Sequence, residues 1–133
     1  MVVWISGFML VFYIIALSIT ARAEARGRVS PAARLWLLAL LFTPLIGSLG
    51  FSASLGEMRN VLLISPAFVV TVGYALMKMR QGGAAIGQGV GWMLSAIPAV
   101  DALAVAPCSL PLALAFVALI PLLRLWQRCI AAT

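Results

Sequence analysis

Apolar residues fill five long stretches of this sequence, and short polar connections separate them. Each stretch approaches or exceeds the roughly 18–20 residues that a helix needs to cross the hydrocarbon core of a bilayer. The connections are too short to fold into soluble domains. The pattern therefore predicts an all-α integral membrane protein, a single domain that forms a five-helix transmembrane bundle. The predicted helices are residues 2–21, 31–55, 60–79, 84–106 and 109–129.

Proline positions refine the second predicted helix. Ser30 and Pro31 suit an N-cap and a first helical position, so we expect the helix to begin there. Pro44 lies in its middle, where proline removes a backbone hydrogen bond and clashes with the preceding turn. We therefore expect a kink at Pro44, followed by partial unwinding of the half that contains glycine and serine.

The fourth stretch differs from the others in its many small residues. Gly83, Gly87, Gly91 and Ser95 recur every four residues, so a helix places them along one stripe. Small residues let helix backbones approach closely in lipid, where packing and hydrogen bonds hold helices together. The stripe predicts packing against other membrane helices or subunits. The alternative is a flat or lipid ligand that lies against this backbone.

Basic residues are distributed unevenly among the connections. With five spans, the first and third connections and the C-terminus fall on one side of the membrane, and they contain all but one of the nine basic residues. Because lysine and arginine are enriched in cytoplasmic loops, we expect the N-terminus outside, the C-terminus in the cytoplasm, and a bacterial inner (cytoplasmic) membrane as the location. The basic residues on the predicted cytoplasmic side are Arg22, Arg26, Arg28, Arg34, Lys78, Arg80, Arg124 and Arg128. Arg59 falls on the other side.

Composition agrees with this interpretation. The chain is 65% hydrophobic and 9% charged, unlike a soluble domain. Its net charge of +6 follows the predicted topology, so membrane lipid and not nucleic acid is the expected partner. Histidine is absent and no residues have metal-ligand spacing, so no metal site is expected. Cys108 and Cys129 lie roughly 30 Å apart on one predicted helix, which indicates free thiols in packing positions.

Asp101 is the first candidate for chemistry. It lies about five residues from the outer end of the fourth predicted helix, roughly 8 Å inside that end. A carboxylate within a membrane helix is costly, and it commonly marks a functional site that faces the bundle interior. A structural role, in packing or at the interface, remains the alternative. Arg59 is on the same side and is the expected partner in an ion pair.

The arginine-rich first connection is the second candidate. Arg22, Arg26 and Arg28 follow the first predicted helix, where guanidinium groups could meet the phosphate or diphosphate of a substrate. Glu24 lies among them and could either neutralise its neighbours or contact the ligand. The alternative is an ordinary basic loop that sets topology and touches anionic lipid.

Three segments resemble the later half of UbiA-type polyprenyltransferase homologues. Residues 13–28, YIIALSITARAEARGR, are similar to a helix and the cytoplasmic loop after it. Residues 87–103, GQGVGWMLSAIPAVDAL, resemble a late helix of that family with an Ile-Pro-x-x-Asp-Ala-Leu pattern. Residues 112–133 are similar to its last helix and basic ending. The resemblance covers most of the chain.

The resemblance implies a helical bundle around a cavity for an isoprenoid diphosphate. In that family two aspartate-rich motifs hold Mg²⁺ against the diphosphate, since this ion prefers oxygen ligands. The present sequence contains only three acidic residues and no Asp-x-x-x-Asp pair. We therefore expect no catalytic residue and no cofactor in this chain. Mg²⁺ would enter only if a partner or a missing segment supplied the aspartates. The acidic residues are Glu24, Glu57 and Asp101.

Three functions remain open at this stage. The first is a partial or split UbiA-like protein that contributes to an isoprenoid-binding cavity and is inactive as an isolated chain. The second is a small non-enzymatic subunit that scaffolds a larger membrane complex through its glycine stripe. The third is a transporter element that uses Asp101, although no inverted repeat is visible.

Overall fold

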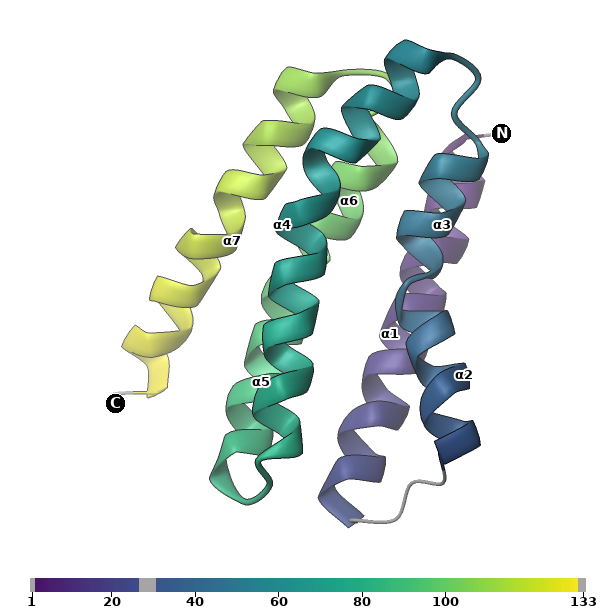
Figure 1. Ribbon diagram of the computed structural model, residues 1–133. Coiled ribbons are helices and arrows are strands. Elements are labelled where there is room, and N and C mark those ends of the chain that lie inside the picture. The colour runs from purple at the N-terminus through teal and green to yellow at the C-terminus, as the bar shows by residue number, and fades with distance from the viewer. Residues whose placement is uncertain (1, 27–30, 132–133) are drawn as a thin grey trace.

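The computed structural model describes residues 2–26 and 31–131, and within these ranges the chain forms seven helices and no strand (Figure 1). Successive segments run in alternating directions, so the two termini lie at opposite ends of the bundle. The C-terminal ends of α1, α4 and α7 lie at the same end of the bundle (Figure 1). The helices are α1 (Val2–Arg26), α2 (Pro31–Leu41), α3 (Thr43–Gly50), α4 (Leu55–Arg80), α5 (Ala84–Ser95), α6 (Ile97–Val105) and α7 (Leu110–Ala131).

A proline interrupts the second predicted helix, as expected. The helix breaks at Phe42, between α2 and α3, two residues before Pro44. The Phe42 amide still donates to the carbonyl of Leu38 at 3.0 Å, and Ile46 donates to Phe42 at 3.1 Å, so the two halves remain nearly continuous. The expected unwinding is confined to the end of this half, because α3 stays helical to Gly50 and the chain is non-helical only from Phe51 to Ser54.

The fourth predicted helix is also divided by a proline. Ala96 joins α5 to α6, and its amide donates to the carbonyls of Trp92 and Met93, both at 3.1 Å. Pro98 has no amide hydrogen, so the carbonyl of Leu94 loses its usual helical donor. Despite this break, Ala84–Val105 is long and apolar enough to cross a membrane.

Helix α4 begins with a capping arrangement that the sequence interpretation missed. The Ser54 hydroxyl accepts from the amide of Glu57 at 3.2 Å, and the Glu57 carboxylate accepts from the amide of Ala53 at 2.7 Å. The Ser-x-x-Glu spacing is typical of such a cap. Glu57 and Arg59, which the sequence interpretation left outside the helices, therefore belong to α4, and the helix begins five residues before the predicted start at residue 60.

The core forms where α1, α4 and α6 converge. The Phe68 ring of α4 lies 6.0 Å from the ring of Tyr13 and 5.7 Å from that of Phe42. The buried Tyr13 hydroxyl donates to the carbonyl of Met93 at 2.9 Å, which ties α1 to α5 just before the break at Ala96. This bond satisfies a phenol that would otherwise be costly to bury.

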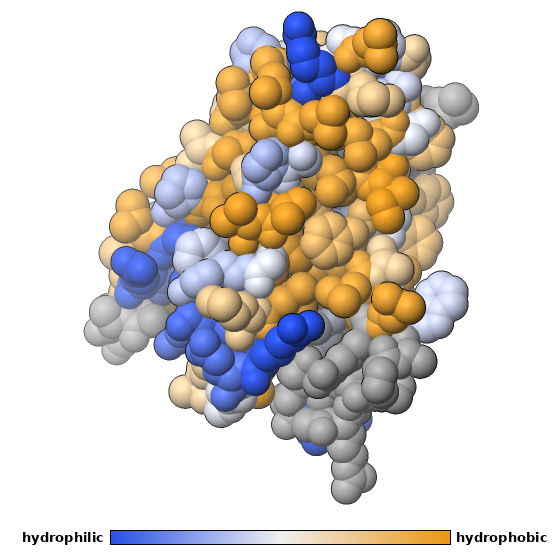
Figure 2. Space-filling view, viewed as in Figure 1, coloured by the Kyte–Doolittle hydropathy of each residue, from blue (hydrophilic) through white to orange (hydrophobic). Residues whose placement is uncertain are grey.

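The helices have the length and surface of a membrane protein. Leu55–Arg80, Ala84–Val105 and Leu110–Ile130 are each long and apolar enough to span a bilayer, and Gly7–Arg22 is a shorter apolar helix. Figure 2 shows that hydrophobic side chains cover most of one face, while hydrophilic ones gather near the C-terminal end. An apolar surface of this extent suits contact with lipid chains.

Candidate functional site

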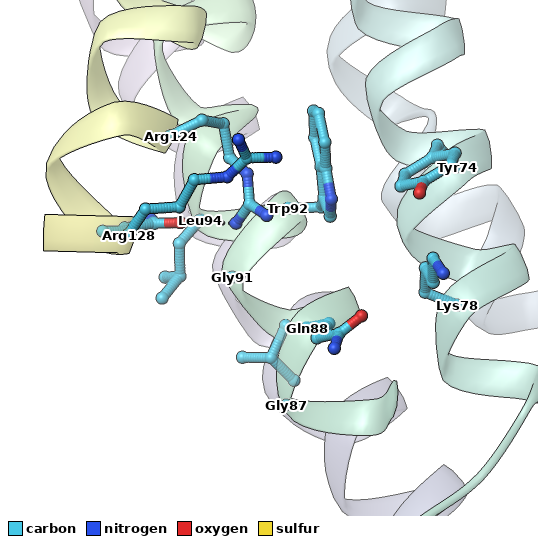
Figure 3. Close-up of a pocket in the computed structure, with 11 residues that line it drawn as sticks. Tyr74, Lys78, Gly87, Gln88, Gly91, Trp92, Leu94, Arg124 and Arg128 are labelled. Carbon is cyan, nitrogen blue, oxygen red and sulfur yellow. Dashed lines mark hydrogen bonds between the residues drawn. The ribbon is translucent and has the colours of Figure 1, made fainter. Parts of the chain in front are cut away.

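A cavity of about 670 Å³ opens between α4, α5 and α7 at the basic end of the bundle (Figure 3). Helix α5 contributes small residues and Trp92, whereas α4 and α7 contribute the cations. None of the 11 lining residues is acidic. They are Tyr74, Lys78, Gly87, Gln88, Val90, Gly91, Trp92, Leu94, Arg124, Gln127 and Arg128.

Trp92 stands at the centre of an aromatic and cationic row. The guanidinium carbon of Arg124 lies 4.2 Å from the Trp92 ring centroid, which is a close cation–π contact. On α4, the Tyr74 ring meets Trp92 edge to face at 4.9 Å, and Lys78 Nζ lies 5.7 Å from the Tyr74 ring. Figure 3 shows Arg124 and Tyr74 approaching Trp92 from α7 and α4. The aromatic rings thus connect cations on two helices.

Neutral groups hold Arg124 in place. Its Nη1 donates to Gln127 Oε1 at 2.7 Å, and the Ser95 hydroxyl lies 3.3 Å from the same oxygen. Ser95 also donates to the carbonyl of Gly91 at 2.9 Å. The Arg124 Nε atom is buried and has no acceptor among the described residues. The guanidinium is therefore oriented but keeps its full positive charge.

Glycines make room for these side chains. A Cβ atom on Gly91 would lie 3.0 Å from Arg124 Nη1 and 3.3 Å from Gln127 Oε1, so a larger residue would push both away. A Cβ on Gly87 would meet nothing within 4 Å, which leaves its backbone open to the cavity. The space in front of α5 thus depends on these two positions.

The predicted glycine stripe does not act as a single packing face. A Cβ on Gly83 would meet no atom within 4 Å, and Gly83 instead forms the turn before α5 with a φ of 55°, which favours glycine. Gly91 and Ser95 face side chains of α7. The closest helix contact comes from Gly89, where a Cβ would lie 2.7 Å from the carbonyl oxygen of Ala75 in α4.

The residues predicted as substrate ligands do not line this cavity. Arg22 and Arg26 are exposed on the last turns of α1. The side chain of Glu24 and all of Arg28 lie outside the residues that the structure describes. Asp101 is half-buried in α6, in the opposite half of the bundle from the cavity.

The expected pair between Asp101 and Arg59 does not form. Both side chains belong to the described part of the chain, and no ion pair joins them. Asp101 lies on α6, and Arg59 is exposed on the second turn of α4. Cys108 and Cys129 are free thiols, but both are exposed and not in the packing positions expected for them.

The described residues provide few ligands for a metal ion. Among the described residues, no group of three or more His, Cys, Asp or Glu side chains is arranged to hold one. The cavity lining consists of cations, aromatic rings, amides and apolar groups. These are poor ligands for Mg²⁺, which prefers carboxylate and phosphate oxygens.

Sequence reasoning missed the cavity because its parts come from three separate helices. It placed Lys78, Arg124 and Arg128 on one side of the membrane but gave them only a topological role. One signal was available: Tyr74 and Lys78, like Arg124 and Arg128, are four residues apart and so share a helix face. Only the folded chain shows that both faces turn toward Trp92.

A scan against models of protein families and searches among curated proteins and solved structures found no match to this chain.

Proposed function

We propose that this chain is a membrane protein that binds an isoprenoid amphiphile in the cavity between α4, α5 and α7. In this proposal it is a partial or split UbiA-like protein and catalyses no prenyl transfer as an isolated chain. The observation that carries the proposal is the combined lining of the cavity, which joins apolar side chains to a cationic and aromatic rim. Such a lining suits a molecule with an apolar tail and a polar head.

The position of the cavity supports an amphiphilic ligand. Val90 and Leu94 of α5 provide apolar surface, and Leu94 is 45% exposed. Lys78 and Arg128 lie near the ends of their helices, where membrane proteins meet the headgroup region. A ligand whose tail follows α5 would thus place its head among the cations.

The lining also accounts for the proposed lack of catalysis. Prenyl transfer of the kind that the resemblance implies needs carboxylates that hold Mg²⁺ against a diphosphate. No lining residue is a carboxylate, and Asp101 lies in the other half of the bundle. A second chain or a further segment would have to provide these ligands.

The proposal places the cavity on the cytoplasmic side of a bacterial inner membrane. In this proposal α2 with α3 and α5 with α6 are each one broken span, so the helices from α1 to α7 make five passes across the membrane. Arg22, Arg26, Lys78, Arg80, Arg124 and Arg128 then share one side. The excess of basic residues at cytoplasmic ends supports this orientation.

Scaffolding of a larger complex is less well supported. Its main argument was a glycine stripe available for close contact with another helix. Gly87 and Gly91 instead line the cavity, and Gly89 already packs against α4. The stripe therefore favours the alternative of a ligand lying against the backbone.

Photo-crosslinking tests the proposal. The purified chain, in lipid nanodiscs, is irradiated with a benzophenone analogue of farnesol, and the labelled peptides are identified by mass spectrometry. We expect labelling of α4, α5 and α7 that excess farnesol suppresses. Labelling that is spread evenly over all apolar helices, or that farnesol does not suppress, would contradict a specific isoprenoid site.

Two matched glycine variants sharpen this experiment. Gly87→Leu extends a side chain into the cavity and should reduce the specific labelling at least about ten-fold, because it removes the space for the ligand. Gly73→Leu is the control, since Gly73 is exposed on α4, lies outside the cavity and also has no atom within 4 Å of an added Cβ. It should label like the wild type.

A further inference from the structure

The cations of this cavity are held without being neutralised. Arg124 is oriented by the Trp92 ring and by the amide oxygen of Gln127, and Lys78 lies near the Tyr74 ring. In a structural ion pair a carboxylate would cancel the charge, but this lining contains none. Three positive charges therefore face one cavity with no anion to balance them, and this arrangement favours an anionic ligand.

Arg124 also has a hydrogen-bond donor without an acceptor. Gln127 Oε1 accepts from Nη1, but the buried Nε atom has no acceptor in the described chain. A buried donor without a partner costs free energy. A phosphate group carries several acceptor oxygens and suits the planar fork of a guanidinium better than a single amide oxygen does.

We infer that the cavity binds the phosphate or diphosphate group of its ligand through Lys78, Arg124 and Arg128, without a divalent metal ion. This inference rests on the proposed function and specifies the ligand class. Gln127 Oε1 occupies a position that a phosphate oxygen can take, so Gln127 keeps Arg124 oriented while the cavity is empty. Gly87 and Gly91 allow the group to approach the backbone of α5.

The inference explains why small residues and cations occur together here. A side chain at position 91 would displace Arg124 and Gln127, and one at position 87 would fill the cavity. The cation–π contact limits the motion of Arg124, which reduces the entropy lost on binding. Arg128 is exposed and Lys78 half-buried, so both remain accessible to a ligand that enters from the headgroup region.

The test compares three ligands that differ only in the head group. Binding of farnesol, farnesyl monophosphate and farnesyl diphosphate to the chain in nanodiscs is measured by calorimetry, with Mg²⁺ and with EDTA. We expect each phosphorylated ligand to bind at least about ten-fold more tightly than farnesol, as one charge-assisted contact would give. The gain should be the same in EDTA as in Mg²⁺.

Two substitutions in the cavity test which residues cause the tighter binding of phosphorylated ligands. Arg124→Gln removes the guanidinium and should abolish most of the phosphate gain. Gln127→Glu places a carboxylate beside Arg124 with little change in shape, so it should neutralise Arg124 and remove most of the gain while farnesol still binds. The control is Arg80→Gln, which removes an exposed cation from the same end of the bundle, outside the lining. It should keep the gain.

The outcomes separate this inference from the proposed function. Equal binding of farnesol and farnesyl monophosphate, a gain that requires Mg²⁺, or a gain that survives Gln127→Glu would each overturn the inference and leave isoprenoid binding intact. Failure of all three ligands to bind would overturn both. Competition with inorganic phosphate identifies the source: full displacement of farnesyl monophosphate at millimolar phosphate indicates a site for free phosphate, and weak displacement indicates a lipid head group.

Discussion

Both ends of the bundle contain a groove, but the two grooves differ in chemistry. The groove near the N-terminus lies between α1 and α3, has a volume of about 320 Å³, and is lined almost entirely by apolar groups, among them Phe8, Phe12 and Phe51. The cavity near the C-terminus is about twice as large and presents Lys78 and Arg124. Helix packing alone produces a groove at either end. Only the second has the side chains to select a ligand.

The difference suggests how each groove behaves in a bilayer. An apolar groove between membrane helices binds one apolar chain hardly more tightly than another, because lipid tails are as apolar as the groove itself. A cationic groove near the headgroup region discriminates strongly, since charge and hydrogen bonds are worth more where water is scarce. Specific function therefore belongs to the basic end in this proposal, and the other end is expected to be filled by lipid.

Thiol labelling gives the largest expected contrast between the two ends. Cys108 lies at the turn before α7 and Cys129 near the end of α7, and both are exposed. With the cavity in the cytoplasm, a membrane-impermeant maleimide added to bacterial spheroplasts should label Cys108 and leave Cys129 unlabelled until the membrane is opened. The variants Cys108→Ser and Cys129→Ser report on each site alone.

Other labelling patterns would contradict the proposed orientation. Labelling of Cys129 and protection of Cys108 would reverse the orientation and move the cavity outside. Labelling of both thiols in sealed spheroplasts would show that α7 does not cross the membrane. In either case the positive-inside argument from the basic residues would fail, although the cavity itself would remain.

Substitution of neighbouring glycines gives the next largest effect. Gly89→Val should lower the free energy of unfolding by about 3 kcal/mol, because the added atoms would clash with the backbone of α4 at Ala75 and Met79. Gly87→Val, two residues away, should change it by no more than about 0.5 kcal/mol, since that position is open. Unfolding by SDS in mixed micelles measures both. Equal losses would contradict the open surroundings of Gly87 and show that it too is a close packing position.

The sequence predicts the fold more completely than it predicts the site. Apolar length indicates the helices and Pro44 indicates the break between α2 and α3, because these effects act within a few residues along the chain. The choice between Gly87 and Gly89 as the contact with α4 depends on how α5 is rotated. Rotation is set by the neighbouring helices, and a repeat of four residues cannot reveal it.

The candidate site was harder to predict for a related reason. The sequence indicated Asp101 and the arginines of the first connection as candidates, since isolated charges are conspicuous in an apolar sequence. Arg124 was assigned to topology, a role that it could fill without Trp92. Their contact joins positions 92 and 124, and such a distant pairing carries no local signal.

Substitution of Asp101 should have the smallest effect on stability. It tests whether a residue outside the cavity contributes to ligand binding. Its carboxylate has no ion pair in the described chain, and it belongs to α6, which contributes no residue to the cationic lining. Asp101→Asn keeps the shape and removes the charge, so the free energy of unfolding should fall by no more than about 0.5 kcal/mol, as for substitutions that break no paired contact. The SDS titration measures this, and farnesyl monophosphate affinity should match the wild type. A large loss of affinity with unchanged stability would show that Asp101 serves the ligand site, and the basic end could then no longer be treated as the sole functional region.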